Sequence, residues 1–416
     1  MSAGGARPGG DGDAPSDRAV ARTLPAMTAV QAVVAMGSFA LSVLAPQLGV
    51  DLGRLGALGG VLFGVGALAS LATGRLIRWL GDLRLAALCM GCVLAAMAGL
   101  AVEAAATGGV RAMLWPAALL LGLAFGPETP ASASVLARVT PPARRPWVFS
   151  IRQTGNQIGA MAGSLGLPAL LAHHAAAPFA LVALLAAAVA LACLRLVRSD
   201  GGGARPDPSA PVSASAGDRA SGLRELAASP ALRLLTVTTV VFMATQVCLN
   251  LFVMSHAVRH WRLDVPVAAG WVAVMQGAGL AGRLLWGRVA QRPGVSTRRL
   301  LGGLGTLTGA SGLMLFLWPA TPPAAALAVL IALLGLSASG WNGVMVAEIA
   351  RLAGPARAGA VTGAALLFGY AGLALAPPGF AALGGAIGTP AAFAVPLVAT
   401  ALLGMRLLWA GSRHPA

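Results

Sequence analysis

Twelve long apolar stretches constrain this chain more than any other feature of its sequence. Each holds about 20 mostly apolar residues, the length that a helix needs to cross the hydrocarbon core of a bilayer. The alternating pattern of membrane-spanning strands is absent, so we expect helices. The stretches run Pro25–Leu48, Leu55–Thr73, Leu85–Ala106, Ala112–Leu136, Trp147–Leu171, Ala177–Leu194, Leu234–Val258, Val265–Trp286, Leu300–Trp318, Ala324–Ala350, Ala360–Phe380 and Ala391–Trp409.

The composition supports the same interpretation. Charged residues make up 10% of the chain and apolar residues 57%. A soluble globular protein carries about 25% charged residues, so this chain lacks the polar surface that a soluble fold would need. We therefore predict an all-α membrane protein with twelve transmembrane helices.

The basic residues are distributed unequally between the two ends of the predicted spans. All 29 are arginine, and the net charge is +16. If the N-terminus is cytoplasmic, most arginines lie on the cytoplasmic side. The exceptions are Arg54, Arg111, Arg259 and Arg262 on the outer side, and Arg152 and Arg283 within spans. This asymmetry follows the positive-inside rule and places both termini in the cytoplasm. Because the charge follows membrane topology, we do not expect nucleic acid as a partner.

Two polar segments set the predicted domain boundaries. Residues 1–24 are too polar for a signal peptide and are predicted to be a disordered cytoplasmic tail. The other long polar stretch contains SDGGGARPDPSAPVSASAGDRAS, a composition typical of flexible linkers. We expect a six-helix bundle at 25–196, a cytoplasmic linker at 197–232, a second six-helix bundle at 233–410 and a cytoplasmic tail at 411–416.

The two predicted bundles are related by a sequence repeat. With an offset of 213 residues, Gly74 falls on Gly287 and Gly81 falls on Gly294. The stretch ARVTPPARR at 137–145 falls on ARLAGPARA at 350–358, with five of nine positions identical. One offset shared by separate loops indicates parallel structural repeats, an arrangement that places a substrate pathway between the halves near the membrane midplane.

The loops of the repeat carry a family resemblance. They read GRLIRWLGDLR from Gly74 to Arg84 and GRLLWGRVAQRPGVSTRR from Gly282 to Arg299. These resemble the loop signature of the major facilitator superfamily. The stretches SIRQTGNQIGAMAG at 150–163 and GWNGVMVAEIAR at 340–351 look like stretches of bacterial members of this superfamily, including branches that carry organic anions. The acid of the usual signature is replaced by Arg78 in one half and Gln291 in the other. The GPxxGG element of drug antiporters and the sugar-porter signatures are absent.

The resemblance implies a fold, a mode of action and a set of gating residues. It implies two six-helix repeats that rock about a central site, so that the site faces each side of the membrane in turn. Gly74, Arg78, Gly81, Gly287 and Arg292 then become gating candidates in the loops. The resemblance also implies that spans five and seven face the central cavity.

Two motifs suggest other chemistry but have a simpler explanation. Gly277-x-Gly279-x-x-Gly282 matches a dinucleotide fingerprint, yet it lies in a membrane span without the preceding strand that the fingerprint needs. Cys89 and Cys92 form a CxxC in an apolar span with no second ligand pair. We expect both to serve helix packing. The histidines lack metal-ligand spacing, and no Walker loop, catalytic triad or haem signature is present, so we expect neither an enzyme nor a metal or cofactor.

Four charged residues fall within the spans, where a charge costs from about 2.5 to over 10 kcal/mol. They are Glu128, Arg152, Arg283 and Glu348. The offset of 213 places an uncharged residue opposite each of them. Charges that occur together in one half only are expected to form ion pairs. We therefore predict two pairs, Glu128 with Arg152 and Arg283 with Glu348.

The two predicted pairs receive different roles. Arg283 and Glu348 lie near the cytoplasmic ends of their spans, and we predict a structural latch there. Glu128 lies near mid-bilayer between two prolines and is a candidate for substrate binding or proton coupling. Arg152 is shallower, and two roles remain open for it: binding an anionic substrate, or simply reaching the interface with its long side chain.

Polar amides and large side chains complete the candidate site. The amides are Gln31, Gln153, Asn156, Gln157, Gln246, Asn250, Gln276 and Asn342, and Asn156 and Asn250 are preferred because they come from spans five and seven. Most buried amides bridge helices, which is the competing explanation for each. Trp341, Phe368 and Tyr370 are candidates for an apolar wall.

Together these observations predict a secondary transporter of a small organic solute, with anions among the candidates and the proton as a possible coupling ion. The use of arginine as the only basic residue, with abundant alanine and glycine, suggests a GC-rich bacterial genome, so we expect the membrane to be a bacterial inner membrane. Two alternatives remain open: efflux of small hydrophobic compounds, and a membrane sensor or scaffold that keeps the fold without transporting anything.

Overall fold

The computed structural model describes residues 17–141, 144–199, 216–354 and 357–412, and these residues form helices and connecting turns without strands. The first six helices are α1 (Asp17–Leu44), α2 (Leu52–Leu80), α3 (Asp82–Thr107), α4 (Leu114–Val139), α5 (Arg145–His173) and α6 (Ala177–Ser199). The rest are α7 (Ala216–Ala228), α8 (Pro230–Arg259), α9 (Val265–Val289), α10 (Thr297–Phe316), α11 (Ala324–Ala338), α12 (Asn342–Ala353), α13 (Ala358–Ile387) and α14 (Thr389–Ser412).

These helices are consistent with the twelve predicted spans. Ten segments of the described chain are long and apolar enough to cross a membrane, with α11 and α12 counted as one. The other two predicted spans are α5, which carries several polar residues, and the shorter α10. The helices extend beyond the predicted spans at many ends because a helix continues into the polar interface, where hydropathy no longer marks it.

The structure differs from the predicted boundaries most clearly in three places. The helix α1 begins at Asp17, so the last part of the predicted N-terminal tail is helical. The helix α7 lies inside the predicted linker, where its Ala- and Gly-rich sequence resembles a loop. The span predicted at 324–350 is interrupted at Ser339–Trp341, between α11 and α12. Residues 1–16, 200–215 and 413–416 of the predicted tails and linker lie outside the described residues.

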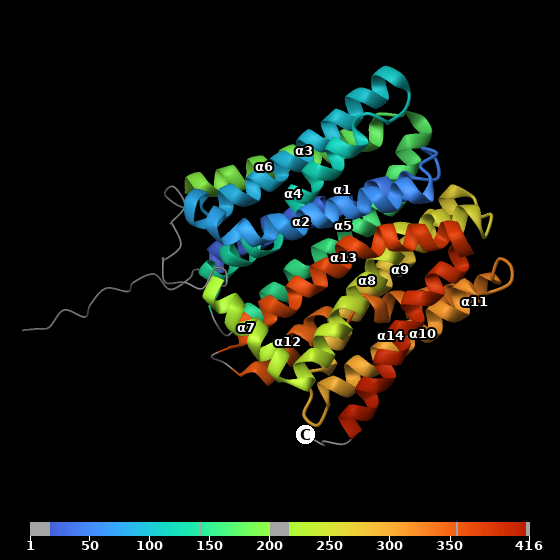
Figure 1. The fold of residues 1–416 in the computed structure, drawn as a ribbon. Helices are drawn as coiled ribbons and strands as arrows, with labels where there is room; N and C mark the ends of the chain where they lie inside the picture. Colours follow the sequence, from blue (N-terminus) through green and yellow to red (C-terminus); the bar gives the residue numbers. More distant parts are fainter. Residues whose placement is uncertain (1–16, 142–143, 200–215, 355–356, 413–416) are drawn as a thin grey trace, which may run out of the picture.

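The two halves repeat one packing order, as the sequence repeat predicts. In the first half α1 packs on α5, α2 on α4 and α3 on α6. In the second half the equivalent partners pack in the same way: α8 on α13, α9 on α11 and α10 on α14. The halves lie side by side in Figure 1, from blue to green and from yellow to red. Gly81 and its counterpart Gly294 both take a positive φ, 87° and 79°, in equivalent turns.

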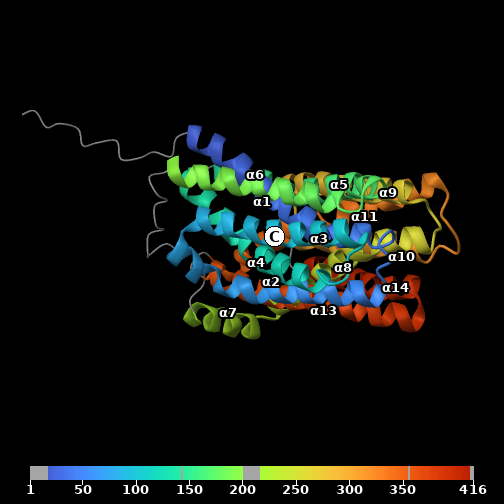
Figure 2. The ribbon, with the colours of Figure 1, turned by 90° about the horizontal axis from the view of Figure 1, so that it is seen from above.

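The halves meet through α2 with α13 and through α5 with α9. We call the side on which α1 begins the terminal side; Figure 2 shows α7 at the same end of the bundle. The other side is closed by close helix contacts. A Cβ on Gly56 of α2 would lie 2.7 Å from the carbonyl oxygen of Pro377 on α13, so only glycine fits there. Arg259 Nη2 also donates to the Val50 carbonyl oxygen at 2.7 Å across the two halves.

Candidate functional site

A cavity of about 460 Å³ lies between the two halves. Its wall is formed by α1, α2, α4 and α5 of the first half and by α8, α9, α12 and α13 of the second. Its size is within the usual range for small-molecule sites. Seven of the eight predicted binding residues line it: Glu128, Gln153, Asn156, Gln246, Asn250, Trp341 and Asn342.

Glu128 on α4 is the carboxylate of the cavity. Glu128 lies between Pro127 and Pro130 along the helix, and it is only 3% exposed. Its Oε1 accepts hydrogen bonds from Arg152 Nη2 at 3.1 Å and from Ser132 Oγ at 3.0 Å, while Thr129 Oγ1 donates to Oε2 at 2.8 Å. The predicted pairing of Glu128 with Arg152 is therefore present.

Arg152 lies behind Glu128 rather than in the cavity. It is 1% exposed, does not line the cavity and donates its Nε to Ser132 Oγ at 2.7 Å. The structure therefore shows neither of the two roles considered for Arg152, because its side chain reaches neither the membrane interface nor the cavity where a substrate would bind. Two glycines of α5, Gly155 and Gly159, allow the α1 backbone to approach closely and bury this part of α5.

Arg283 on α9 is the cation that lines the cavity. Its Nη1 donates to Gln153 Oε1 at 3.3 Å, which joins the two halves, and its buried Nε has no hydrogen-bond partner among the described residues. No carboxylate lies within ion-pair distance of Arg283 in the described part of the chain. The predicted latch with Glu348 is wrong in this structure.

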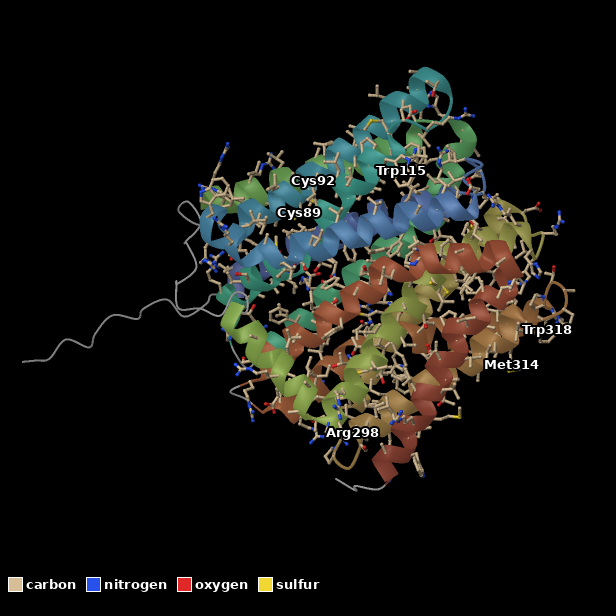
Figure 3. All side chains as sticks on the ribbon, viewed as in Figure 1. Cys89, Cys92, Trp115, Arg298, Met314 and Trp318 are labelled. Atoms are coloured by element: carbon tan, nitrogen blue, oxygen red, sulfur yellow. The ribbon has the colours of Figure 1, made fainter. Side chains whose placement is uncertain are left out.

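Glu348 pairs with two other arginines. Its carboxylate accepts hydrogen bonds from Arg298 Nε on α10 at 3.0 Å and from Arg351 Nε and Nη2, each at 2.8 Å. Glu348 is only 1% exposed, and Figure 3 places Arg298 near the base of the second half. The correction has a simple cause: Arg351 lies one helical turn along α12, so it faces the same way as Glu348. We call this group the second-half clasp.

The first half has an equivalent clasp that the sequence analysis missed. Asp82, the first residue of α3, is 2% exposed and accepts two hydrogen bonds from Arg138 Nη2 at 2.9 and 3.1 Å. Arg138 and Arg351 are equivalent under the repeat offset, although their acids come from different helices. Arg78, which occupies the usual acid position, is exposed. The available signal was Asp82 itself, four residues after the missing acid.

The amides of the cavity are held in pairs. Gln276 donates to Asn250 at 3.1 Å, and Asn342 donates to Gln246 at 3.3 Å. Asn156 donates at 3.0 Å to Gln157, which is fully buried and outside the cavity. In each pair at least one amide faces the cavity, so the second amide fixes its orientation.

Aromatic side chains form much of the remaining wall. Tyr370 and Trp341 line the cavity as predicted, whereas Phe368 is 45% exposed elsewhere on α13 and is not part of it. Four phenylalanines that the sequence analysis did not select also line it: Phe39, Phe63, Phe125 and Phe149. Hydropathy alone does not separate a phenylalanine that faces a cavity from one that faces lipid.

The remaining candidates have structural surroundings or lie on the surface. Gly279 packs on Ser339 and Gly282 packs on the Leu336 backbone, which is the helix packing predicted for the dinucleotide-like motif. Cys89 and Cys92 lie on α3, away from the cavity (Figure 3). Among the gating candidates Gly74 is buried, Gly287 lines the cavity and Arg292 is exposed. No cluster of three potential metal ligands occurs within the described ranges.

Comparisons with known proteins agree with this architecture. The chain matches the sequence profile of the Major Facilitator Superfamily over residues 26–377. No curated protein matches the chain in a sequence search.

Solved structures with the same fold include three transporters. A bacterial homolog of the human lysosomal transporter Spinster, in an inward-facing and unoccupied conformation, has a TM-score of 0.69 at 16% identity, with 96% of each chain covered. The peptide transporter POT in complex with sulfate has a TM-score of 0.73 at 17% identity, with 94% of each chain covered. The nucleoside transporter NupG has a TM-score of 0.71 at 13% identity, with 94% of this chain and 99% of that chain covered.

A multi-pass helical bundle with a polar cavity between two repeated halves is the architecture of many secondary transporters. The chain belongs to the Major Facilitator Superfamily.

Proposed function

We propose that this protein carries a small organic anion across a bacterial inner membrane by alternating access, coupled to a proton or another ion gradient. The observation that supports an anion is Arg283. Around the cavity stand two guanidinium groups, Arg152 and Arg283, and one carboxylate, Glu128. Arg152 is neutralised by Glu128, so one positive charge in the cavity is left without a counter-charge.

An uncompensated arginine is costly at this depth. A guanidinium stays protonated in proteins, so it cannot escape the cost of burial by losing its charge. Buried charges in membrane proteins accordingly pair with one another or with backbone carbonyls, and they mark substrate and ion pathways. An anionic substrate supplies the missing counter-charge. A charged cavity fits a transporter better than a sensor or scaffold, which would lose stability to the buried charge without using it. The unpaired arginine also disfavours efflux of uncharged hydrophobic compounds.

The closed side and the cavity together support alternating access. The cavity extends to Ser150 and Val346, which are exposed toward the terminal side, whereas α2 and α13 close the other side. With both termini in the cytoplasm, as the arginine distribution predicts, the cavity opens inward. Rocking the halves about the cavity would break the closed side and open the path outward.

Glu128 is the proposed coupling group. It faces the cavity and at the same time neutralises Arg152. If Glu128 takes up a proton, Arg152 loses its counter-charge and the positive charge around the cavity rises. Proton binding and anion binding would then favour each other, which is the energetic requirement for symport.

Uptake by proteoliposomes tests the proposal. Purified protein is reconstituted, a pH gradient is imposed, and uptake of radiolabelled acetate, benzoate, succinate, glucose and leucine is compared. We expect uptake of at least one carboxylate, stimulated by the gradient and abolished by Arg283→Gln. Glu128→Gln protein that is recovered folded should still exchange the anion but should lose the stimulation by the gradient. Uptake of the neutral sugar alone, unchanged in both variants, would refute the proposed function.

A further inference from the structure

The helix break between α11 and α12 places a second source of positive potential in the cavity. The helix α12 begins at Asn342, and its first residues, Asn342, Gly343 and Val344, line the cavity. Trp341 precedes them without a capping side chain, and the backbone N–H groups of these three residues make no hydrogen bond within the described structure. Free N–H groups and the helix dipole make such an end favourable for an anion.

The break lies against the same segment of α9 that carries Arg283. Gly282 packs on the backbone of Leu336, just before the break. One turn later, Trp286 donates its Nε1 to the Leu336 carbonyl oxygen at 3.0 Å and touches Gly340. Arg283 lies between these two contacts along α9. The guanidinium with its unpartnered Nε and the open helix end therefore belong to neighbouring parts of one cavity wall.

Aromatic rings surround this positive region. Aromatic residues make up only 5% of the chain, yet six of them line the cavity: Phe39, Phe63, Phe125, Phe149, Trp341 and Tyr370. Phe149 lies one turn before Gln153 on α5, and Gln153 holds Arg283. Residues four apart on a helix are about 5–6 Å from each other. A carboxylate at Arg283 would therefore have an aromatic wall within the length of a small molecule.

The first-half rings form a connected surface. Phe63 lies edge-on to Phe125 with ring centroids 5.1 Å apart, and Phe39 lies 6.4 Å from Phe63. On the other half, Trp341 satisfies its own Nε1 by donating to the Ala338 carbonyl oxygen at 3.0 Å. Its ring contributes apolar surface without needing a polar partner. Flat rings pack favourably against such walls in offset or edge-on geometry.

We propose that the cavity binds an aromatic monocarboxylate, with its carboxylate between Arg283 and the N-terminus of α12 and its ring against the phenylalanine wall. This inference rests on the proposed transport of an anion and names the substrate class. The single unmatched positive charge favours one carboxylate over two. The planar guanidinium suits a carboxylate because it can donate two parallel hydrogen bonds.

Ligand-induced thermal stabilisation of the purified protein tests the class. Benzoate, benzamide, acetate and phthalate differ by one property each: charge, ring or number of carboxylates. A ligand that binds only the folded state raises the apparent Tm, and at a given concentration a tighter ligand raises it more. We expect benzoate to raise the Tm by a few degrees, benzamide to have no effect, and acetate and phthalate to have clearly smaller effects at equal concentration.

Gly343 offers a matched pair of variants for the proposed subsite. A Cβ at Gly343 meets no atom within 4 Å, so a small side chain fits without rearrangement. Gly343→Asp places a tethered carboxylate at the open end of α12, where it should occupy the subsite. We expect this variant to be more stable without ligand and to lose its response to benzoate. Gly343→Asn has the same shape without the charge and should keep the response.

Arginine variants give an independent control. Arg283→Gln should abolish the response to benzoate, and Arg283→Lys, which keeps the charge but not the planar fork, should weaken it. Arg288→Gln should leave it unchanged, because Arg288 is exposed and its guanidinium lies over the Trp147 ring, 5.9 Å from the centroid.

The outcomes separate this inference from the proposed function. Equal responses to benzoate and acetate, or equal responses in the Gly343→Asp and Gly343→Asn variants, would overturn the aromatic subsite while proteoliposome uptake of an anion still stands. If no carboxylate is bound or taken up by the wild-type protein, the proposed function and the subsite both fail. The comparison of benzoate with benzamide needs no variant, so it holds even where a variant does not fold.

Discussion

Removing the carboxylate of Glu128 should destabilise the protein strongly, and removing Arg152 with it should restore much of the loss. In Glu128→Gln the guanidinium of Arg152, only 1% exposed, keeps its charge and loses its counter-charge. Breaking a buried ion pair in this way costs about 3–5 kcal/mol. Arg152→Gln should cost less, because the carboxyl group that is left unpaired can be neutralised by a proton.

The double variant Glu128→Gln/Arg152→Gln distinguishes pairing from two independent effects. It contains no unpaired buried charge, which is the state that makes breaking a buried pair costly. We expect its free energy of unfolding to lie closer to that of the wild type than does Glu128→Gln alone. The measurement is an unfolding titration in mixed micelles, followed by circular dichroism, for the four proteins.

A surface pair serves as the control. Glu225 on α7 and Arg357 are 28% and 60% exposed and lie 2.6 Å apart. Water and salt screen such a pair, so Glu225→Gln should cost less than about 1 kcal/mol. If the two single changes at Glu128 and Arg152 simply add in the double variant, the two residues do not depend on each other and the reasoning fails.

Three further outcomes are expected. A double-mutant cycle between Glu348 and Arg298 should give a coupling energy above about 0.5 kcal/mol, whereas a cycle between Glu348 and Arg283 should not; coupling of the second pair would restore the latch. Gly56→Val should lower the free energy of unfolding by about 1–3 kcal/mol through overpacking against α13, measured by the same titration. A valine in place of a glycine of α9 whose added Cβ would meet no atom within 4 Å should leave the free energy of unfolding unchanged. A cysteine at Ser209, in a variant without native cysteines, should resist impermeant thiol reagents in intact cells. If it is labelled as fast as a cysteine in the α3–α4 turn, the predicted topology is wrong.

The fold could be predicted from the sequence because the bilayer leaves few alternatives. A backbone in hydrocarbon must satisfy its own hydrogen bonds, so each apolar stretch of sufficient length becomes a helix. The repeat offset then predicted which helices would be equivalent, and the packing order of the two halves agrees with it. The helix α7 escaped prediction because it is packed onto α13, through Gly222 against the Ala360 backbone, and is not marked by hydropathy.

The site was only partly predictable, since sequence gives the depth of a residue better than the direction in which it faces. Arg152 and Arg283 are both arginines within spans; the sequence predicted a latch for Arg283 and left two roles open for Arg152. The structure places Arg152 behind Glu128 and Arg283 in the cavity. Gly155 and Gly159, which mark the packed face of α5, were the sequence signal that could have placed Arg152 in the interior of the first half.

The partner of Glu348 could not be read from the sequence for another reason. Arg351 was within reach as a neighbour one turn away, but Arg298 comes from the start of α10 and meets Glu348 only through tertiary packing. Likewise, Arg78 occupies the usual position of the family acid, and Asp82 at the start of the next helix is the acid that pairs with Arg138. Ion pairs of this kind depend on where helices end, the least predictable feature of a span.

The two clasps have a consequence for how the sequence of such a chain can evolve. Each clasp joins helices within one half, Asp82 with Arg138 in the first and Glu348 with Arg298 and Arg351 in the second. A substitution in one clasp can thus be compensated within the same half, without a matched change in the other. Two descendants of one duplicated segment can in this way keep equivalent arginines while the acids that hold them move to different helices.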